Sequence, residues 1–471
     1  MREFVEHIHF VGIGGIGMSG IAEVLLDLGY RVSGSDVSRS EITRRLEQAG
    51  AELYYRHDPG HLGNADVVVY SSAILPDTPE LEAARSRKVP VVPRAEMLAE
   101  IMRFRKGIAI TGTHGKTTTT SLVSTLLINA GTDPTFVVGG VINSTNTNGR
   151  LGTGEFLVAE ADESDASFLR LQPQIAVVTN IDRDHMETYG GEYDRLQQTY
   201  VDFLHNLPFY GLAILCFDDP GVREICEHLH RPFVSYGFSD GVDFRAGHFS
   251  QSGRESAFEV FHDGESMGDF RLSLPGRHNV LNALAVIAVG IKLGIPERFI
   301  RTALSGFEGI ARRFQAFGEI HFPGHSVNLV DDYAHHPSEI QATLQAAHDC
   351  WPDRRIVVVF QPHRYTRTRD LFDDFVELLA RIPALVITEV YPAGEARIPG
   401  SDGDALCRAV RNQGGAPEFA KTLEQLKGIL PNLTRQDDIV ITMGAGTIGQ
   451  FAAQLAAAGT SGCRKTEQAS A

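Results

Sequence analysis

The sequence contains little cysteine. Its five cysteines are widely spaced and form no C-x-x-C pair, so neither a disulfide framework nor a zinc site is expected. The first ten residues, MREFVEHIHF, include acids and lack the long apolar core of a secretory signal. These shortages exclude the class of small secreted proteins held together by disulfides, and they predict a protein of the reducing cytoplasm.

Positive charge is also scarce. The 43 Lys and Arg residues are outnumbered by 59 Asp and Glu residues, which gives a net charge of −16. A nucleic acid or an anionic membrane is therefore not expected as the main partner. An anionic ligand must instead be bound locally, by loops, helix N-termini, a metal or a few placed basic side chains.

Long apolar runs are nearly absent. One uncharged stretch, 439–463, is long enough to span a bilayer. Glycines interrupt it, among them Gly444 and Gly446, and it also contains Gln450 and Gln454. We therefore expect a buried strand, a turn and a helix in this stretch, and no membrane insertion.

The chain is long, in contrast, and strand-like and helix-like segments alternate along it. The 471 residues exceed what one hydrophobic core usually supports. Short apolar runs alternate with amphipathic stretches, which predicts an α/β fold with mostly parallel sheets. The pattern restarts three times, each time with a strand that runs into a glycine-rich or charged turn, at 8–12, 107–112 and 327–332. We predict domains at 1–104, 105–313 and 314–459, with a disordered tail at 460–471.

The first of these strands ends in a glycine-rich turn, 12–20, that opens a helix. Backbone N–H groups at such a helix start can approach a diphosphate closely. The next predicted strand ends at Asp36, the spacing at which dinucleotide-binding folds present an acid to a ribose. This motif alone does not distinguish NAD from a UDP-sugar, and a tight turn without any ligand is a further alternative.

The second restart contains a phosphate-loop pattern, G-T-H-G-K-T-T-T-T at 112–120, between a strand and a helix. Small residues free the backbone amides to surround phosphates, Lys116 can reach the β and γ oxygens, and the hydroxyl of Thr117 can bind Mg²⁺. Two residues rather than the usual four separate the glycines. A chance G-K-T is the structural alternative, but the threonine run after a strand favours ATP as the ligand.

Two further predicted strands end in acidic turns. One ends at Glu160, and the other ends at Thr179 and runs into a turn that contains His185. The carboxyl ends of parallel strands meet at one edge of a sheet, and Mg²⁺ prefers oxygen ligands. We therefore predict a metal site beside the phosphate loop, although a solvated turn is the alternative for any single acid.

Together these motifs resemble those of the Mur ligase family. The segments that carry the resemblance are 111–119, 160–165, 180–186, 276–279 with Asn282, 312–314 and 331–337. The resemblance covers nearly the whole chain, and the order and spacing of the segments make it specific. The resemblance implies an ATP-dependent ligase that forms an amide bond. It also implies a Rossmann-like N-terminal domain for a UDP-sugar, a central P-loop-type ATPase domain and a Rossmann-like C-terminal domain for an amino acid.

The same resemblance assigns individual residues to each ligand. The ATP-binding residues are Gly112, Thr113, His114, Gly115, Lys116, Thr117, Thr118, Asn282, Arg313 and Asp332. The UDP-sugar residues are Gly14, Gly15, Ile16, Gly17, Asp36, Ser71 and Ser72. Thr117, Glu160 and His185 are the Mg²⁺ ligands, and Lys116, Glu160 and His185 are the catalytic residues. Several family members carry a carbamylated lysine after the His185 motif, but no lysine lies between His185 and His205 here.

Within the family, the segments 12–20, 331–337 and 360–367 look like those of the member that adds L-alanine to UDP-N-acetylmuramate in peptidoglycan precursor synthesis. Arg364 and Arg367 are close enough in sequence to converge on one carboxylate. The remaining candidates for the amino-acid site are Tyr333, His335 and His363.

Several alternatives stay open at this point. A sister ligase that adds a ready-made peptide to the same UDP-sugar during wall recycling shares these motifs. A nicotinamide oxidoreductase would use the first glycine-rich turn and Asp36 but would leave the phosphate loop without a role. A non-catalytic UDP-sugar sensor would not need Lys116, Glu160 and His185. A monomer and a homodimer are both compatible with the sequence.

Overall fold

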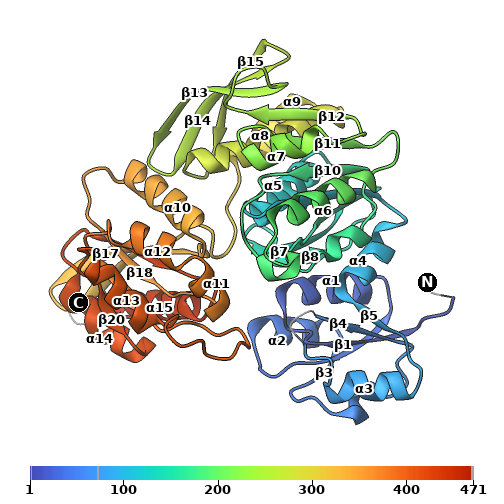
Figure 1. Cartoon of the computed structure of the whole chain (residues 1–471), viewed down its shortest axis with the longest axis horizontal. Helices are drawn as coiled ribbons and strands as arrows, with labels where there is room; N and C mark the ends of the chain where they lie inside the picture. Colours follow the sequence, from blue (N-terminus) through green and yellow to red (C-terminus); the bar gives the residue numbers. More distant parts are fainter. Residues whose placement is uncertain (2, 72–73, 468–471) are drawn as a thin grey trace. The chain divides into compact units, whose positions relative to one another are not determined.

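The protein is represented by a computed structural model that describes residues 1, 3–71 and 74–467. Their strands form three β-sheets accompanied by helices (Figure 1). The chain divides into two compact units. The first unit comprises Met1–Phe249, Ala257–Ser273 and Asn279–Glu308, and the second comprises Ser250–Ser256, Leu274–His278 and the chain from Gly309 onward.

The first sheet is parallel throughout, with the strand order β3-β2-β1-β4-β5. The chain winds outward from β1 in both directions, so the gap between the ends of β1 and β4 is the position where Rossmann-like sheets bind ligands. The strands are β1 (His7–Val11), β2 (Arg31–Ser35), β3 (Glu52–Tyr54), β4 (Val67–Tyr70) and β5 (Val91–Pro93). The helices are α1 (Ile16–Asp27), α2 (Glu41–Gln48), η1 (Pro59–Leu62), α3 (Pro79–Ser86) and α4 (Arg94–Met102).

The second sheet has ten strands in the order β15-β14-β13-β12-β11-β10-β6-β9-β7-β8. Its strands are β6 (Lys106–Thr111), β7 (Thr135–Ile142), β8 (Thr147–Arg150), β9 (Phe156–Glu160), β10 (Ile175–Val178), β11 (Leu212–Cys216), β12 (Phe233–Gly237), β13 (Phe244–Ser252), β14 (Glu255–His262) and β15 (Glu265–Leu272). Its helices are α5 (Lys116–Asn129), η2 (Ser167–Arg170), η3 (Met186–Tyr189), α6 (Tyr193–His205), α7 (Pro220–Cys226), α8 (Arg277–Lys292) and α9 (Glu297–Ser305).

The register of the second sheet aligns the carboxyl ends of three neighbouring strands. Strand β6 lies between β9 and β10 and runs parallel to both. Ile110 of β6 pairs with Glu160, and Thr111 pairs with Val178. The phosphate loop and both predicted acidic turns therefore leave the sheet at the same edge, as the sequence predicts.

The first two sheets are joined within the first unit through α1, which packs against β7 and β8. The contact is close because glycines face each other: a Cβ on Gly149 would come within 2.5 Å of the Cα of Gly20. The amide of Asn148 donates a hydrogen bond to the backbone oxygen of Ile16 at 2.5 Å, and Arg45 donates one to the Asn148 side-chain oxygen at 2.5 Å. The first glycine-rich turn is thereby held beside the second sheet.

The third sheet lies in the second unit, in the order β16-β17-β21-β18-β19-β20, and only the β16–β17 pair is antiparallel. Its strands are β16 (Gln315–Phe322), β17 (His325–Asp332), β18 (Ile356–Phe360), β19 (Leu385–Thr388), β20 (Glu418–Ala420) and β21 (Ile439–Met443). Its helices are α10 (Pro337–Cys350), α11 (Tyr365–Asp370), α12 (Phe372–Leu379), α13 (Gly403–Asn412), α14 (Leu423–Leu433) and α15 (Ile448–Glu467). The four inner strands, β17, β18, β19 and β21, match the apolar runs in the sequence. The two edge strands do not, because β20 has three residues and β16 has a single buried residue, Ile320.

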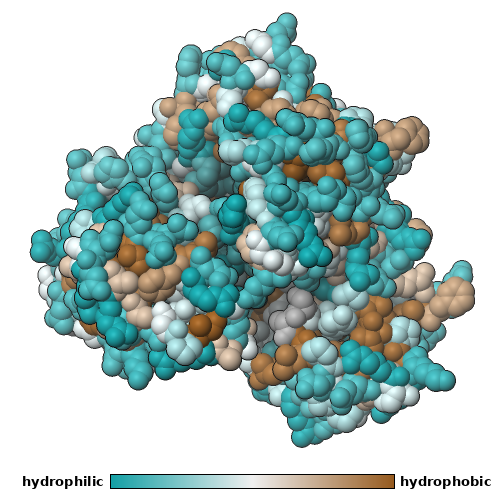
Figure 2. Space-filling view, viewed as in Figure 1, coloured by the Kyte–Doolittle hydropathy of each residue, from teal (hydrophilic) through white to brown (hydrophobic). Residues whose placement is uncertain are grey.

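The uncharged stretch 439–463 forms the buried strand β21, a turn and most of α15, as expected. No helix among the described residues is both long and apolar enough to cross a membrane. The face in Figure 2 is mainly hydrophilic, with small hydrophobic areas. Helix α15 continues to Glu467, and residues 468–471 lie outside the described residues. The predicted domain boundaries and the tail stay predictions.

Candidate functional site

The phosphate loop connects β6 to α5 and encloses the ammonium group of Lys116. The Lys116 Nζ donates hydrogen bonds to the backbone oxygens of Gly112 and Thr113 at 2.7 and 3.2 Å. It also donates to both carboxylate oxygens of Glu163, each at 2.9 Å. Lys116 is thus held at the loop by backbone dipoles and by one buried acid.

Glu163 was not among the predicted site residues, although it lies in the acidic turn that follows β9. Its side chain is only 3% exposed. Burial raises the pKa of the Glu163 carboxyl to about 7, against the opposing attraction of Lys116. Burial also disfavours the charged form of Asp162, but Lys116 and Arg94 outweigh it and lower the Asp162 pKa to about 2. Two adjacent carboxyls beside one lysine therefore differ sharply in their affinity for a proton.

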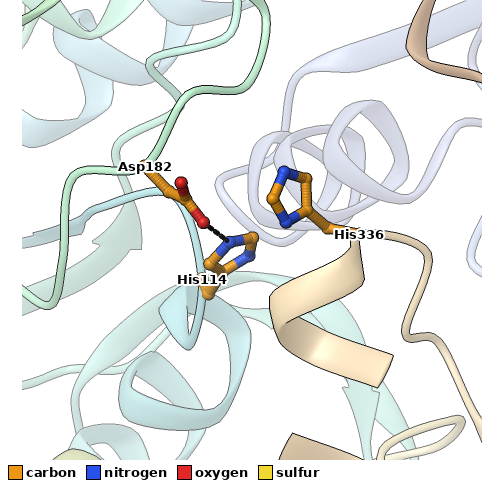
Figure 3. A group of neighbouring side chains, drawn as sticks. All are labelled: His114, Asp182 and His336. Carbon is orange, nitrogen blue, oxygen red and sulfur yellow. Dashed lines mark hydrogen bonds and ion pairs between the residues drawn. The ribbon is translucent and has the colours of Figure 1, made fainter. Parts of the chain in front are cut away.

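The turn after β10 holds the phosphate loop from its other side. Asn180 accepts a hydrogen bond from the backbone N–H of His114 at 2.8 Å and donates one back to the His114 carbonyl at 3.0 Å. The backbone N–H of Asp182 donates to the Thr113 hydroxyl at 2.8 Å. The carboxylate of Asp182 lies 3.1 Å from the His114 Nε2, and Figure 3 shows the two side chains next to each other. These reciprocal bonds fix the loop to the neighbouring strand end.

Asn282 of α8 lies next to the phosphate loop, as its assignment to the ATP site requires. A Cβ on Gly115, whose φ is +83°, would come within 2.6 Å of the Asn282 side-chain oxygen. The hydroxyl of Thr119 donates to that oxygen at 3.2 Å, and the Asn282 amide donates to the Asn279 side chain at 3.1 Å. Only glycine fits at this position of the loop.

The predicted Mg²⁺ ligands come from the aligned strand ends. Glu160, at the end of β9, accepts a hydrogen bond from the backbone N–H of Gly139 at 2.6 Å and lies close enough to Lys116 to stabilise its charge. Thr117 and Thr118 are in the first turn of α5 and are buried. His185 precedes η3, and its Nε2 lies 3.4 Å from the carboxylate of Asp184. The roles of Thr117, Glu160 and His185 as Mg²⁺ ligands stay predictions.

The second acidic turn is attached to the first, which brings the His185 segment to the same edge of the sheet. The hydroxyl of Thr188, in η3, donates to the backbone oxygen of Ser164 at 2.6 Å. The hydroxyl of Tyr189 donates to the backbone oxygen of Glu163. The structure thus ties together the two loops that the sequence assigns to one metal site.

The first glycine-rich turn contacts Asp36 directly. The backbone N–H of Gly14 donates to the Asp36 carboxylate at 2.9 Å, and a Cβ on Gly14 would come within 2.7 Å of the same oxygen. Gly15 caps α1, which begins at Ile16 and includes Gly17. Ser71 lies against Gly12, whereas Ser72 lies outside the described residues. Asp36 therefore fixes the loop, and its predicted contact with a ribose stays a prediction.

The predicted amino-acid residues are neighbours in the second unit. The rings of Tyr333 and His335 meet edge to face at 5.4 Å, and those of His335 and His363 at 5.7 Å. Arg367 is buried and donates to the His363 backbone oxygen at 3.5 Å, whereas Arg364 forms an ion pair with Glu395 at 3.9 Å. Further rings and acids in contact with this group, which the sequence did not assign to the amino-acid site, are Tyr391, Glu339 and Glu395.

Arg313 and Asp332, assigned to the ATP site from the sequence, also lie in the second unit. The carboxylate of Asp332 accepts backbone hydrogen bonds from Phe314 at 2.7 Å and from Ala334 at 2.8 Å. Burial raises the pKa of Asp332 to about 6, although Arg313 opposes this shift. Arg313 stacks on the ring of Tyr333 at 4.8 Å. Their contact with ATP stays a prediction.

The half-buried imidazole of His278 is expected to make the stability of the protein depend on pH. Burial is the main cause that lowers the His278 pKa from 6.5 to about 4; Glu339 opposes this shift, and Arg313 adds to it. Below pH 6.5, His278 is protonated in the unfolded chain but stays neutral in the folded chain. The stability that is present above pH 6.5 is therefore lost as the pH falls to about 4. We expect His278→Gln to reduce this acid-induced loss of unfolding free energy. The reduction is at most about 3 kcal/mol, and it is smaller because solvent screens the half-buried ring.

Urea unfolding of wild type and His278→Gln at pH 7.5, 6 and 5 measures this effect. The variant's free energy of unfolding should change less between pH 7.5 and pH 5 than that of the wild type. An equal change in both proteins would show that His278 does not titrate differently in the folded and unfolded states.

Three family models match consecutive segments of the chain. Residues 7–106 match "Mur ligase family, catalytic domain", residues 110–290 match "Mur ligase middle domain", and residues 312–446 match "Mur ligase, glutamate ligase domain". The segments follow the order of the three sheets. The predicted α/β fold with three domains is thereby confirmed.

Relatives of known name match over nearly the full length. A UDP-N-acetylmuramate–L-alanine ligase of Methylococcus capsulatus is 56% identical over 452 residues, which are 96% of each chain. One of Halorhodospira halophila is 54% identical over 97% of this chain and 94% of that relative. The crystal structure of a UDP-N-acetylmuramate–alanine ligase from Thermotoga maritima superimposes with a TM-score of 0.83 at 31% identity, covering 97% of this chain and 99% of that one.

Proposed function

This chain belongs to the Mur ligase family and is an ATP-dependent ligase that forms an amide bond, and we propose that it joins L-alanine to the carboxylate of UDP-N-acetylmuramate. The observation that carries the proposal is the phosphate loop around Lys116, beside an edge that gathers Glu160, Asp162 and Glu163. The names of the relatives at 54–56% identity supply the two substrates.

The first step would make the carboxylate reactive. A carboxylate and an amine do not condense in neutral water, so one carboxylate oxygen attacks the γ-phosphorus of ATP and the bond to the ADP oxygen breaks. The products are an acyl phosphate and ADP. In this step Lys116 neutralises charge on the phosphate oxygens, and the backbone N–H groups of the loop hold them in place.

The residues around the loop suit Mg²⁺. The hydroxyl of Thr117 and the carboxylate of Glu160 are hard oxygen donors of the kind that Mg²⁺ prefers, with His185 in the attached turn. When bound, the ion would offset the negative charge of the ATP phosphates. The acids at this edge, Glu160, Asp162 and Glu163, outnumber its two cations, Lys116 and Arg94, which favours a divalent cation there.

The second step would form the amide. The uncharged amine of L-alanine attacks the acyl carbon, the C–O bond to phosphate breaks, and the amine loses a proton. His335 and His363 are equal candidates for the proton acceptor, and Arg364 or Arg367 for the partner of the alanine carboxylate. A cytoplasmic location and a monomeric or homodimeric state belong to this proposal.

Phosphate release by the purified protein with Mg²⁺, ATP and UDP-N-acetylmuramate tests the proposal. Release should depend on L-alanine, and mass spectrometry should detect a product heavier by one alanine residue. Omitting each substrate in turn, and replacing Mg²⁺ with EDTA, are the controls. Release driven by a tripeptide but not by L-alanine would assign the chain to the sister activity of wall recycling. No release with either amine would refute both assignments.

A further inference from the structure

Arg94, at the start of α4, lies against the first glycine-rich turn. A Cβ on Gly17 would come within 3.0 Å of the Arg94 Nη1 and 3.3 Å of its Cδ. Gly17 is in the first turn of α1, whose backbone N–H groups are the candidate diphosphate site. The guanidinium of Arg94 therefore borders the place where the UDP-sugar is expected.

The other edge of the guanidinium points to the ATP side of the first unit. The Arg94 Nη2 lies 3.4 Å from the carboxylate of Asp162. Asp162 follows β9 and interacts electrostatically with Lys116. Arg94 thus spans the distance between the glycine-rich turn of the first sheet and the acidic turn beside the phosphate loop of the second.

Most of the hydrogen-bonding capacity of Arg94 is unused by the residues that the structure describes. A guanidinium has five N–H donors in a planar fork, suited to phosphate and carboxylate groups. Among the described residues, Asp162 is the only acceptor of an Arg94 side-chain hydrogen bond. The side chain is 20% exposed, so a ligand can reach it while Asp162 holds its other edge.

We propose that Arg94 binds an anionic oxygen group of the UDP-sugar and, through Asp162, holds that substrate beside the ATP site. The proposal rests on the function proposed above. Two groups of the substrate have the required chemistry: the diphosphate, which would lie at Gly17, and the sugar's carboxylate, which must approach the γ-phosphate. Both are negatively charged at neutral pH and accept paired hydrogen bonds from a guanidinium.

Isothermal titration calorimetry with UDP-N-acetylmuramate, UDP and ADP, each without turnover, tests the proposal. In Arg94→Ala we expect the Kd for UDP-N-acetylmuramate to rise about 10- to 100-fold, as for a lost charge-assisted hydrogen bond, and the Kd for ADP to stay within about twofold. A parallel rise for UDP would identify the diphosphate as the partner, and an unchanged UDP affinity would identify the carboxylate.

Two further variants separate binding from structure. Arg94→Lys keeps the charge but loses the planar fork, so it should recover part of the affinity. Arg103→Ala removes an exposed arginine at the other end of α4, where it pairs with Glu100 at 2.8 Å, and should bind like the wild type. All variants are checked by their thermal unfolding midpoints.

Three results would overturn the proposal. They are an affinity of Arg94→Ala for UDP-N-acetylmuramate within twofold of wild type, an equal loss for ADP with a lower unfolding midpoint, and an equal loss in Arg103→Ala. The second result would reduce Arg94 to a structural link between the two sheets. Because these titrations need no product formation, they stay informative even if the wild type fails to ligate L-alanine.

Discussion

Lys116→Met should lower the kcat of ligation by about 10³-fold or more, the largest effect expected of any single change. The Lys116 ammonium is the cation that the phosphate loop holds in place, bonded to two loop carbonyls and to Glu163. Loss of one preorganised charge that stabilises a transition state costs about 10²- to 10³-fold, and here the charge faces the transferred phosphoryl group itself. Phosphate release under saturating substrates measures it.

The matched control is Lys106→Met, at the opposite end of the same strand. Lys106 forms an exposed ion pair with Glu155 at 2.8 Å, so this variant should retain wild-type activity because exposed pairs contribute little. Since Lys116→Met leaves Glu163 buried without its cation, Lys116→Met/Glu163→Gln removes both charges and guards against unfolding. A folded double variant with activity within tenfold of wild type would remove Lys116 from the mechanism.

Glu160→Gln should raise the Mg²⁺ concentration needed for half-maximal rate by at least about tenfold and lower kcat by about 10²-fold. A neutral amide binds a divalent cation more weakly than a carboxylate does, and a metal that offsets phosphate charge contributes several kcal/mol to catalysis. Glu160 lies at the end of β9, near Lys116. A Mg²⁺ titration of the initial rate measures both quantities.

Glu155→Gln makes the same chemical change just before the first residue of β9. Glu155 is exposed and pairs with Lys106, so its Mg²⁺ dependence should match that of the wild type. If Glu160→Gln also kept the wild-type Mg²⁺ dependence, Glu160 would be a structural partner of the Gly139 backbone N–H rather than a metal ligand.

Much of the fold was predictable from short segments. A strand that ends in a glycine-rich turn and a helix start can be recognised within about 15 residues. The spacing of apolar side chains and the residues that favour turns are both visible in so short a segment. Strands β1, β6 and β17 end at the three places where the strand–helix alternation begins again in the sequence. Strand β20 was not predicted because it has three residues, and β16 was not predicted because it buries only Ile320 and so lacks a continuous apolar run.

The alignment of the two acidic turns with the phosphate loop was predictable for a related reason. Parallel strands in one sheet place their carboxyl ends at one edge, so strand ends alone indicated that Glu160 and the His185 turn accompany Lys116. The bonds from Thr188 to Ser164 and from Tyr189 to Glu163 agree with this arrangement.

The partners of the functional groups were decided only by the tertiary structure. Glu163 is 47 residues from Lys116, and Asp162 is 68 residues from Arg94. No spacing along the chain shows that these side chains meet, because each pair depends on strand order and on how α1 joins the first two sheets. The sequence by itself determined the fold class and the loops that carry chemistry, since these depend on local residue patterns. Which acid holds Lys116, and which arginine lies between the two loops, depends on contacts between distant segments that only packing brings together.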